Sequence, residues 1–177
     1  DHKDMNKDEM MKKWMEYATP SEEHKIIAGL AGKWTFVSKS WQAADAKAEE
    51  NKGTSTMKMI LGGRFLTQEI KTKMMGQNYE GHGMMGYVKI KKTFDSIWMD
   101  SMGTGIMHGT GTYDAATKTI TEKGEFTCPM NDGKPAPYRN EWIITDKNNM
   151  TFSMYGKGMD QKGAEFRMME ITYKRVK

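Results

Sequence analysis

Apolar and polar residues alternate with a period of two along most of the chain, beginning near residue 33. This period is typical of β-strands that bury one face. It predicts ten short strands, over residues 33–42, 53–61, 64–74, 79–88, 93–100, 104–113, 119–127, 138–145, 150–156 and 164–175. Glycine pairs and polar turn residues separate them, and the dipeptides at 62–63 and 102–103 suit two-residue hairpin turns. No alternation of strands with helices supports a parallel sheet, so an antiparallel sheet is predicted.

A short helix is predicted before the strands, over residues 21–31. Ser21 is its expected N-cap, His24 stands where a capping box usually has Glu or Gln, and Gly32 closes it. Residues 1–17 are polar with a weak helical spacing, which predicts a partly ordered arm. Residues 18–177 are long enough for one well-buried domain.

Ten consecutive strands joined by hairpins favour an all-β, up-and-down antiparallel barrel. Closure removes the sheet edges and leaves an interior that can hold one small ligand. A two-sheet sandwich is the alternative.

The segment YEGHGMMGYVKI combines three glycines with a histidine and two methionines. No helix follows the glycines, which argues against a phosphate-binding loop. Alternation places Gly81 and Gly83 on one strand face and His82 on the other. A turn at 102–103 would place Phe94 and Trp98 over Gly109 and Gly111, so large rings would cover residues that lack side chains.

Composition narrows the function classes. The net charge is +4, from 27 basic and 23 acidic residues, and it is scattered, so nucleic-acid binding is not expected. A single cysteine, Cys128, excludes an intrachain disulfide and a cysteine-rich zinc site. No apolar run is long enough to span a membrane as a helix. The chain begins at Asp1, which favours a mature exported protein, periplasmic or secreted, over a cytoplasmic one.

The chain is rich in methionine, with 19 such residues spread from Met5 to Met169. Methionine is a pliable, polarizable filler, so an adaptable core or pocket lining is the preferred interpretation. Copper(I) or another soft metal is the alternative.

Several motifs together carry a family resemblance: ATPSEEHK, AGKWTF, ILGGRFLTQEI, GHGMMGY, FDSIWMDSMGTGIMHGTGTYD and MMEITYKR. They resemble a bacterial family known as domain of unknown function 1579, which is similar to the calycin barrels. Gly32 and Trp34 resemble the Gly-x-Trp signature of lipocalins. That resemblance implies a tryptophan over the closed end of the barrel, packed against Arg175 or Arg167. It implies a cavity and no reaction.

Candidate chemistry is sparse. The four histidines lack metal-ligand spacing, and no serine or cysteine stands in a nucleophile motif. Glu69 and Glu170 lie in strand-like runs, where a buried carboxylate would be a ligand anchor or a structural pair before a catalyst.

The sequence therefore predicts a non-enzymatic protein that binds a small, largely apolar molecule and no resident cofactor. The predicted ligand-binding residues are Arg64, His82, Met85, Trp98, Met107, His108 and Arg139. The alternative is a copper or other soft-metal protein of the cell envelope, with His82 and His108 as ligands, or a nitrobindin-like haem barrel with one inward histidine. A homodimer is left open.

Overall fold

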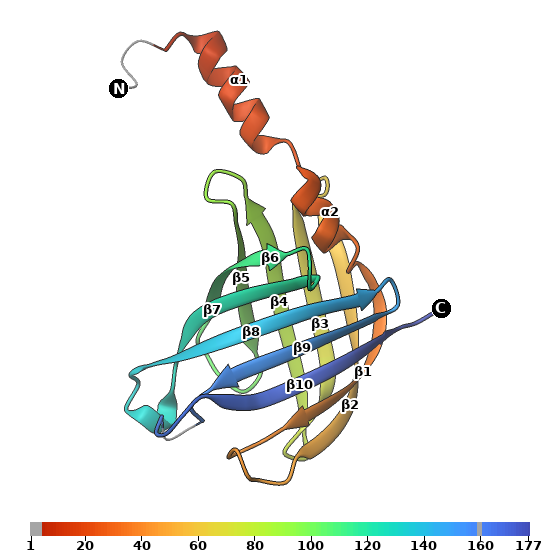
Figure 1. Ribbon diagram of the computed structural model, residues 1–177, viewed down its shortest axis with the longest axis vertical. Helices are drawn as coiled ribbons and strands as arrows, with labels where there is room; N and C mark the ends of the chain where they lie inside the picture. Colours follow the sequence, from red (N-terminus) through yellow and green to blue (C-terminus); the bar gives the residue numbers. More distant parts are fainter. Residues whose placement is uncertain (1–4, 159–160) are drawn as a thin grey trace.

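The computed structural model describes residues 5–158 and 161–177, which form two α-helices, one short 3-10 helix and ten strands (Figure 1). The strands are β1 Gly32–Ser40, β2 Glu49–Ile60, β3 Phe65–Met74, β4 Gln77–Val88, β5 Thr93–Asp100, β6 Met107–Asp114, β7 Thr119–Thr127, β8 Pro135–Asp146, β9 Asn149–Gly156 and β10 Phe166–Arg175. The 3-10 helix, Pro129–Asn131, lies between β7 and β8. All ten predicted strands are present.

The sheet is a closed barrel in which every strand is antiparallel to its neighbour in sequence. Closure comes from β1, which pairs with β2 on one side and with β10 on the other, from Trp34 opposite Arg175 to Ser40 opposite Met169. The predicted up-and-down barrel is confirmed, and the sandwich alternative is wrong.

Two helices precede the barrel. Helix α1, Lys7–Ala18, begins with a capping box between Asn6 and Glu9, buries no residue and projects away from the barrel (Figure 1). Helix α2, Glu22–Ala28, packs on the ends of β3 and β4 and carries the predicted capping box. The His24 imidazole Nδ1 accepts the Ser21 backbone N–H at 3.0 Å. Within the described ranges, neither helix has the length and apolar character needed to cross a membrane.

The barrel is closed at the α2 end. Ile27 and Leu30 are buried there, and the Trp34 indole N–H donates to the Leu30 carbonyl at 3.0 Å. The Arg175 guanidinium lies 4.1 Å from the centre of the Trp34 ring and donates to the carbonyls of Gly29 and Ala31. Of the two candidate arginines, Arg175 therefore packs on the tryptophan.

Gly32 makes this close approach of strand and arginine possible. Its φ is +145°, which side-chain-bearing residues rarely adopt, and a Cβ there would collide with the Arg175 guanidinium. The second candidate, Arg167, stacks instead on Trp41, 5.0 Å from the ring centre.

Two predicted turns are wrong. Residues 61–64 form a four-residue connection, in which Leu61, Gly62 and Gly63 all have positive φ. Residues 101–106 form a six-residue connection, and the backbone N–H of Ser101 at its start donates to the Glu80 carbonyl of β4. The predicted register nevertheless holds from Trp98 opposite Met107 to Phe94 opposite Gly111.

Gly81 and Gly83 share one face of β4, as predicted, and that face is the inner one; the ring that covers glycines is not placed as predicted, because it covers those of β4 and not those of β6. Trp98 leans over Gly81 and Gly83 on β4, and not over Gly109 and Gly111 on β6. Gly109 faces Ser96 and Tyr138, and a Cβ on Gly111 would collide with the β7 backbone at Thr121. Strand pairing alone does not determine toward which neighbouring strand a side chain leans.

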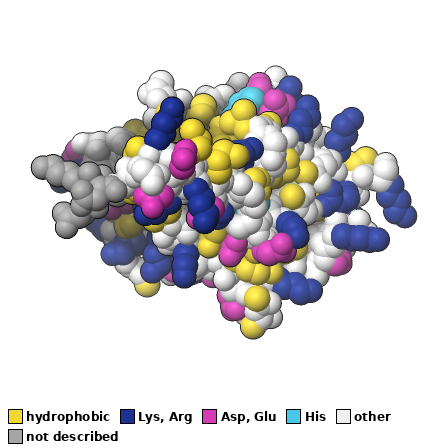
Figure 2. Space-filling view, turned by 90° about the horizontal axis from the view of Figure 1, so that it is seen from above, with side chains coloured by type: hydrophobic (Ala, Val, Ile, Leu, Met, Phe, Trp, Pro, Cys, Tyr) yellow, Lys and Arg dark blue, Asp and Glu magenta, His cyan; other side chains and the backbone are white. Residues whose placement is uncertain are grey.

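On the face shown in Figure 2, Lys and Arg side chains are spread among acidic and apolar ones and form no single stripe.

Gly83→Val should destabilise the fold, because a Cβ at Gly83 lies 2.8 Å from the Trp98 ring. Overpacking of this kind costs about 1–3 kcal/mol, whereas strand propensity, which favours valine, spans only about 1 kcal/mol. The measurement is the denaturant midpoint at unchanged slope. Gly105→Val, where a Cβ meets open space, and His82→Ala, at an exposed site, should each shift stability by less than about 1 kcal/mol. If Gly83→Val were tolerated and His82→Ala lost much stability, the histidine and not the glycine would be the residue that the fold needs in this segment.

Stability should fall on mild acidification through His24. Burial lowers the pKa of this imidazole, so the unfolded chain binds the proton more tightly than the folded one. The contribution of His24 is present above its usual pKa near 6.5 and is lost as the pH falls below it. His24→Gln, which keeps a capping-box side chain, should flatten the dependence of the melting temperature on pH between about 6.5 and 5. If the melting temperature of the variant depended on pH as steeply as that of the unaltered protein, groups other than His24 would cause the loss of stability in acid.

Candidate functional site

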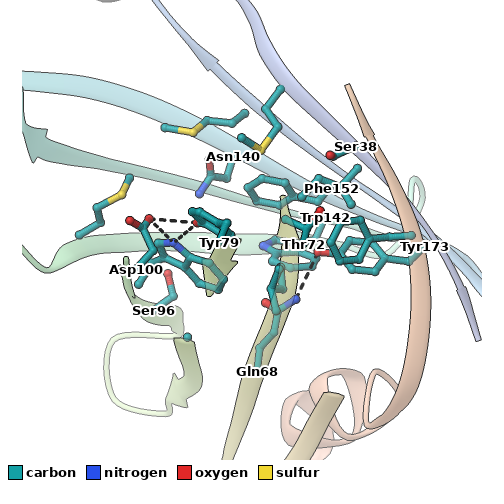
Figure 3. A pocket seen from close by; sticks show the side chains of 18 of the residues that line it. Ser38, Gln68, Thr72, Tyr79, Ser96, Asp100, Asn140, Trp142, Phe152 and Tyr173 are labelled. Carbon is teal, nitrogen blue, oxygen red and sulfur yellow. Dashed lines mark hydrogen bonds between the residues drawn. The ribbon is translucent and has the colours of Figure 1, made fainter. Parts of the chain in front are cut away.

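A cavity of about 240 Å³ occupies the barrel interior (Figure 3). Leu30 marks its α2 end, and Ser40, Met74 and Met102 mark its other end, at the opposite rim of the barrel. Met102 is 54% exposed, so the cavity reaches solvent at that rim.

Aromatic rings and methionine side chains make up most of the cavity wall. Aromatic side chains come from Phe36, Tyr79, Trp98, Tyr138, Trp142, Phe152 and Tyr173. Among the described residues, seven methionines also line it, besides Met84, whose position on β4 is on the outer face with His82: Met57, Met74, Met85, Met102, Met107, Met154 and Met169. Methionine side chains adapt their shape at little cost, so this wall suits an apolar ligand whose outline is not rigidly specified.

A first polar group lies near the open rim. Asp100 Oδ2 accepts the Tyr79 hydroxyl at 3.0 Å and the Trp98 indole N–H at 3.0 Å, and Asp100 Oδ1 accepts the Met102 backbone N–H at 2.9 Å (Figure 3). Burial, and then the nearby Asp100 charge, raise the pKa of Tyr79, so the phenol stays a donor at neutral pH. Asp100 thus accepts three hydrogen bonds, and its bond to the indole N–H holds the Trp98 ring in place as part of the cavity wall.

A second polar group lies deeper. The Gln68 amide donates to Ser55 Oγ and to the Tyr173 hydroxyl, both at 3.2 Å. Burial raises the pKa of Tyr173, which keeps it neutral. This network joins β2, β3 and β10 across the interior.

A third polar group is incomplete. Glu122 on β7 is only 1% exposed, and its Oε2 accepts the Trp142 indole N–H at 3.2 Å. Within the described part of the chain, Glu122 Oε1 has no hydrogen-bond partner, and neither has Oδ1 of Asn140, its cross-strand partner on β8. Burial raises the pKa of Glu122, and the nearby Asp95 charge acts in the same direction, while hydrogen bonding with Ser96, Trp142 and Asn140 acts against it. Burial, with Glu122 beside it, also raises the pKa of Tyr138 to about 12.

Three of the seven predicted ligand-binding residues, Met85, Trp98 and Met107, line this cavity. The other four do not. Arg64 lies in the 61–64 connection and donates to the Leu61 carbonyl, and Arg139 points outward, where it pairs with Glu141 and Glu165 and stacks on Tyr155.

His82 and His108 also lie on the outer surface, on the strands that flank β5. The His82 imidazole is 3.0 Å from Glu80 and is exposed. No histidine in residues 5–158 and 161–177 lines the cavity, so the inward haem ligand is not provided there. His2 lies outside the described residues. A copper site at His82 and His108 stays a prediction, and it would concern the outer surface.

Among the described residues, the carboxylates that line the cavity are Asp100 and Glu122, whereas the two singled out from the sequence face outward. Glu69 is exposed, and Glu170 pairs with Arg167. A signal for Glu122 was present in the sequence, because alternation places it on the same face as Ile120 and Phe126. An acidic residue in an otherwise apolar strand face indicates either burial with a partner or a site.

Comparisons with known proteins agree on the fold. A family model described as "Protein of unknown function (DUF1579)" matches residues 19–175. The crystal structure of Rv2717c from M. tuberculosis is similar, with a TM-score of 0.66 at 13% identity, over 90% of this chain and 100% of that one. The S-type phycobiliprotein lyase CPES from Guillardia theta gives a TM-score of 0.61 at 11% identity, over 92% of this chain and 97% of that one. The comparison with curated protein sequences gives no match.

Glu122→Gln should stabilise the protein at neutral pH. Because the folded-state pKa is raised, the folded protein is most stable with the carboxyl protonated, and stability is lost as the pH rises through that pKa. Glutamine removes the buried charge and brings a donor to the strand position facing Asn140. The free energy of unfolding at pH 7 should rise by about 1–3 kcal/mol.

The matched control is Glu125→Gln, an exposed residue of the same strand, which should change stability by less than about 0.5 kcal/mol. Urea unfolding at pH 5 and pH 8 measures both variants. A loss of stability in Glu122→Gln at pH 8 would contradict the buried, underpaired carboxylate.

Proposed function

The chain belongs to the DUF1579 family, whose description assigns no activity, and we propose from the cavity that it is a non-enzymatic binding protein for one small, largely apolar molecule. The observation that carries the proposal is the 240 Å³ cavity inside a closed barrel, walled by aromatic rings and methionines and reaching solvent at one rim.

The cavity volume limits the ligand. An apolar cavity of about 150 Å³ is known to hold benzene, and sites for drug-sized molecules begin at about 300 Å³. A cavity of about 240 Å³ lies between these sizes and suits a body of one or two rings.

The polar groups in the wall orient rather than react. Asp100 and Gln68 already form hydrogen bonds with neighbouring side chains. The contact of Ser21 with Glu23 and His24 resembles a nucleophile arrangement in composition, but it caps α2, and the imidazole Nδ1 already accepts the Ser21 backbone N–H. A binding role therefore accounts for these groups better than a catalytic one.

The similar solved structures support the barrel fold, but they do not indicate which ligand this chain binds. CPES is named as a phycobiliprotein lyase, and at 11% identity the likeness carries the fold alone. Export from the cytoplasm stays a prediction from the sequence.

Binding can be tested with 1-methylnaphthalene, an apolar two-ring probe, by isothermal titration calorimetry, together with native mass spectrometry of freshly purified protein. We expect micromolar or tighter binding. Ser38→Phe, which places a ring in the cavity, should abolish it. Thr35→Phe places the same ring on the exposed face of the same strand and should leave it unchanged. No binding by the unaltered protein, and no co-purified molecule, would overturn the proposal.

A further inference from the structure

The most informative group in the interior is the incomplete one around Glu122. A carboxylate that is 1% exposed and has one oxygen without a partner is costly, because burying a charge or an unsatisfied polar atom costs folding free energy. Glu122 also belongs to the wall of the cavity, so whatever occupies the cavity can reach it.

The surroundings of Glu122 contain donors, the Ser96 hydroxyl and the Trp142 indole, and also acceptors that have no partner of their own in the part of the chain that the structure describes. Asn140 Oδ1, on the neighbouring strand, is the second atom without a partner among the described residues. The charged or titratable groups that act on Glu122 are Asp95 of β5 and Tyr138 of β8, which are anionic when charged. The adjacent β6 contributes Gly109 and Gly111, which bring no side chain to this place.

We propose that the ligand of this cavity is an apolar primary amine whose ammonium group donates hydrogen bonds to Glu122 Oε1 and Asn140 Oδ1. The inference rests on the proposed function, since it specifies the chemical class of the ligand that the same cavity binds.

Other common polar groups fit this place less well. A hydroxyl has a single hydrogen to donate and would leave one of the two acceptors without a partner. A carboxylate or phosphate has none to donate and would place like charges together. An ammonium has three N–H donors and the opposite charge.

Burial of the ion pair is also less costly here than usual. The carboxylate has already lost its water through folding, so binding adds only the desolvation of the ammonium. The remainder of the ligand lies against apolar walls such as Trp98, Met107 and Phe152, which explains why the amine should carry a ring body.

Binding should be linked to pH. The raised pKa of Glu122 means that its protonated form persists to higher pH in the unliganded protein than an ordinary glutamate would allow, and an ammonium favours the ionised form. Complex formation should therefore release protons below neutral pH, and affinity should rise with pH until the amine itself deprotonates near pH 10.

The test compares three ligands of one shape, 1-naphthylmethylamine, 1-methylnaphthalene and 1-naphthoate, by calorimetry on the full chain at pH 7.5. We expect the amine to bind at least tenfold tighter than the hydrocarbon, and the acid to bind weakest. Titrations at pH 6 in buffers of different ionisation enthalpy should show proton release with the amine and none with the hydrocarbon.

Glu122→Gln should reduce the preference for the amine over the hydrocarbon to less than threefold, and Glu125→Gln should retain the full preference. Equal affinities of the amine and the hydrocarbon for the unaltered protein would overturn the amine inference and leave the binding function standing. Binding of none of the three would overturn both. A preference for the amine that persists in Glu122→Gln would show that the ammonium binds somewhere other than Glu122, which would also overturn the inference.

Discussion

The pairing of β1 with β10 is the interaction on which the rest of the structure depends. Residues near the two ends of the barrel domain meet there, with Trp34 opposite Arg175, so the ring can close only when the last strand is in place. Closure removes both sheet edges and separates an interior from solvent. The same pairing brings Arg175 onto the Trp34 ring and onto the carbonyls that follow α2, so it also closes one end of the barrel.

Once the ring is closed, side-chain size decides how much of the interior remains empty. A barrel of about eight strands is just filled by its own side chains, and ten strands enclose a wider space. Trp98 does not fill this space, because its ring lies against Gly81 and Gly83 and is held by Asp100. Glycines that admit a ring against the wall thereby leave room at the centre.

Much of this architecture could be predicted from alternation and turn residues, including ten strands, the capping box of α2 and the register of β5 with β6. The inward face was harder to predict, because both faces of several strands carry apolar residues. In β4, Met85 points inward and Met84 shares its face with His82. Histidines and arginines were therefore assigned to the interior by their chemistry, and the structure places them outside. Turn lengths also escaped prediction, since Leu61 adopts a positive φ that its residue type does not suggest.

The two inward carboxylates show why one of them indicates a ligand. Asp100 accepts three hydrogen bonds from Tyr79, Trp98 and Met102, so its burial is offset inside the protein and its role is to hold a wall. Glu122 accepts one from Trp142, is more deeply buried, and faces a second acceptor without a partner. A sequence under selection for stability alone would favour a neutral side chain here, because replacing buried charged groups by well-packed apolar residues is often neutral or stabilising. Residues that weaken the fold without an internal benefit are characteristic of functional sites. The deficit at Glu122 is local: it concerns Oε1 and the facing Asn140 Oδ1. Because Glu122 lies in the cavity wall, a donor brought by a ligand would complete it.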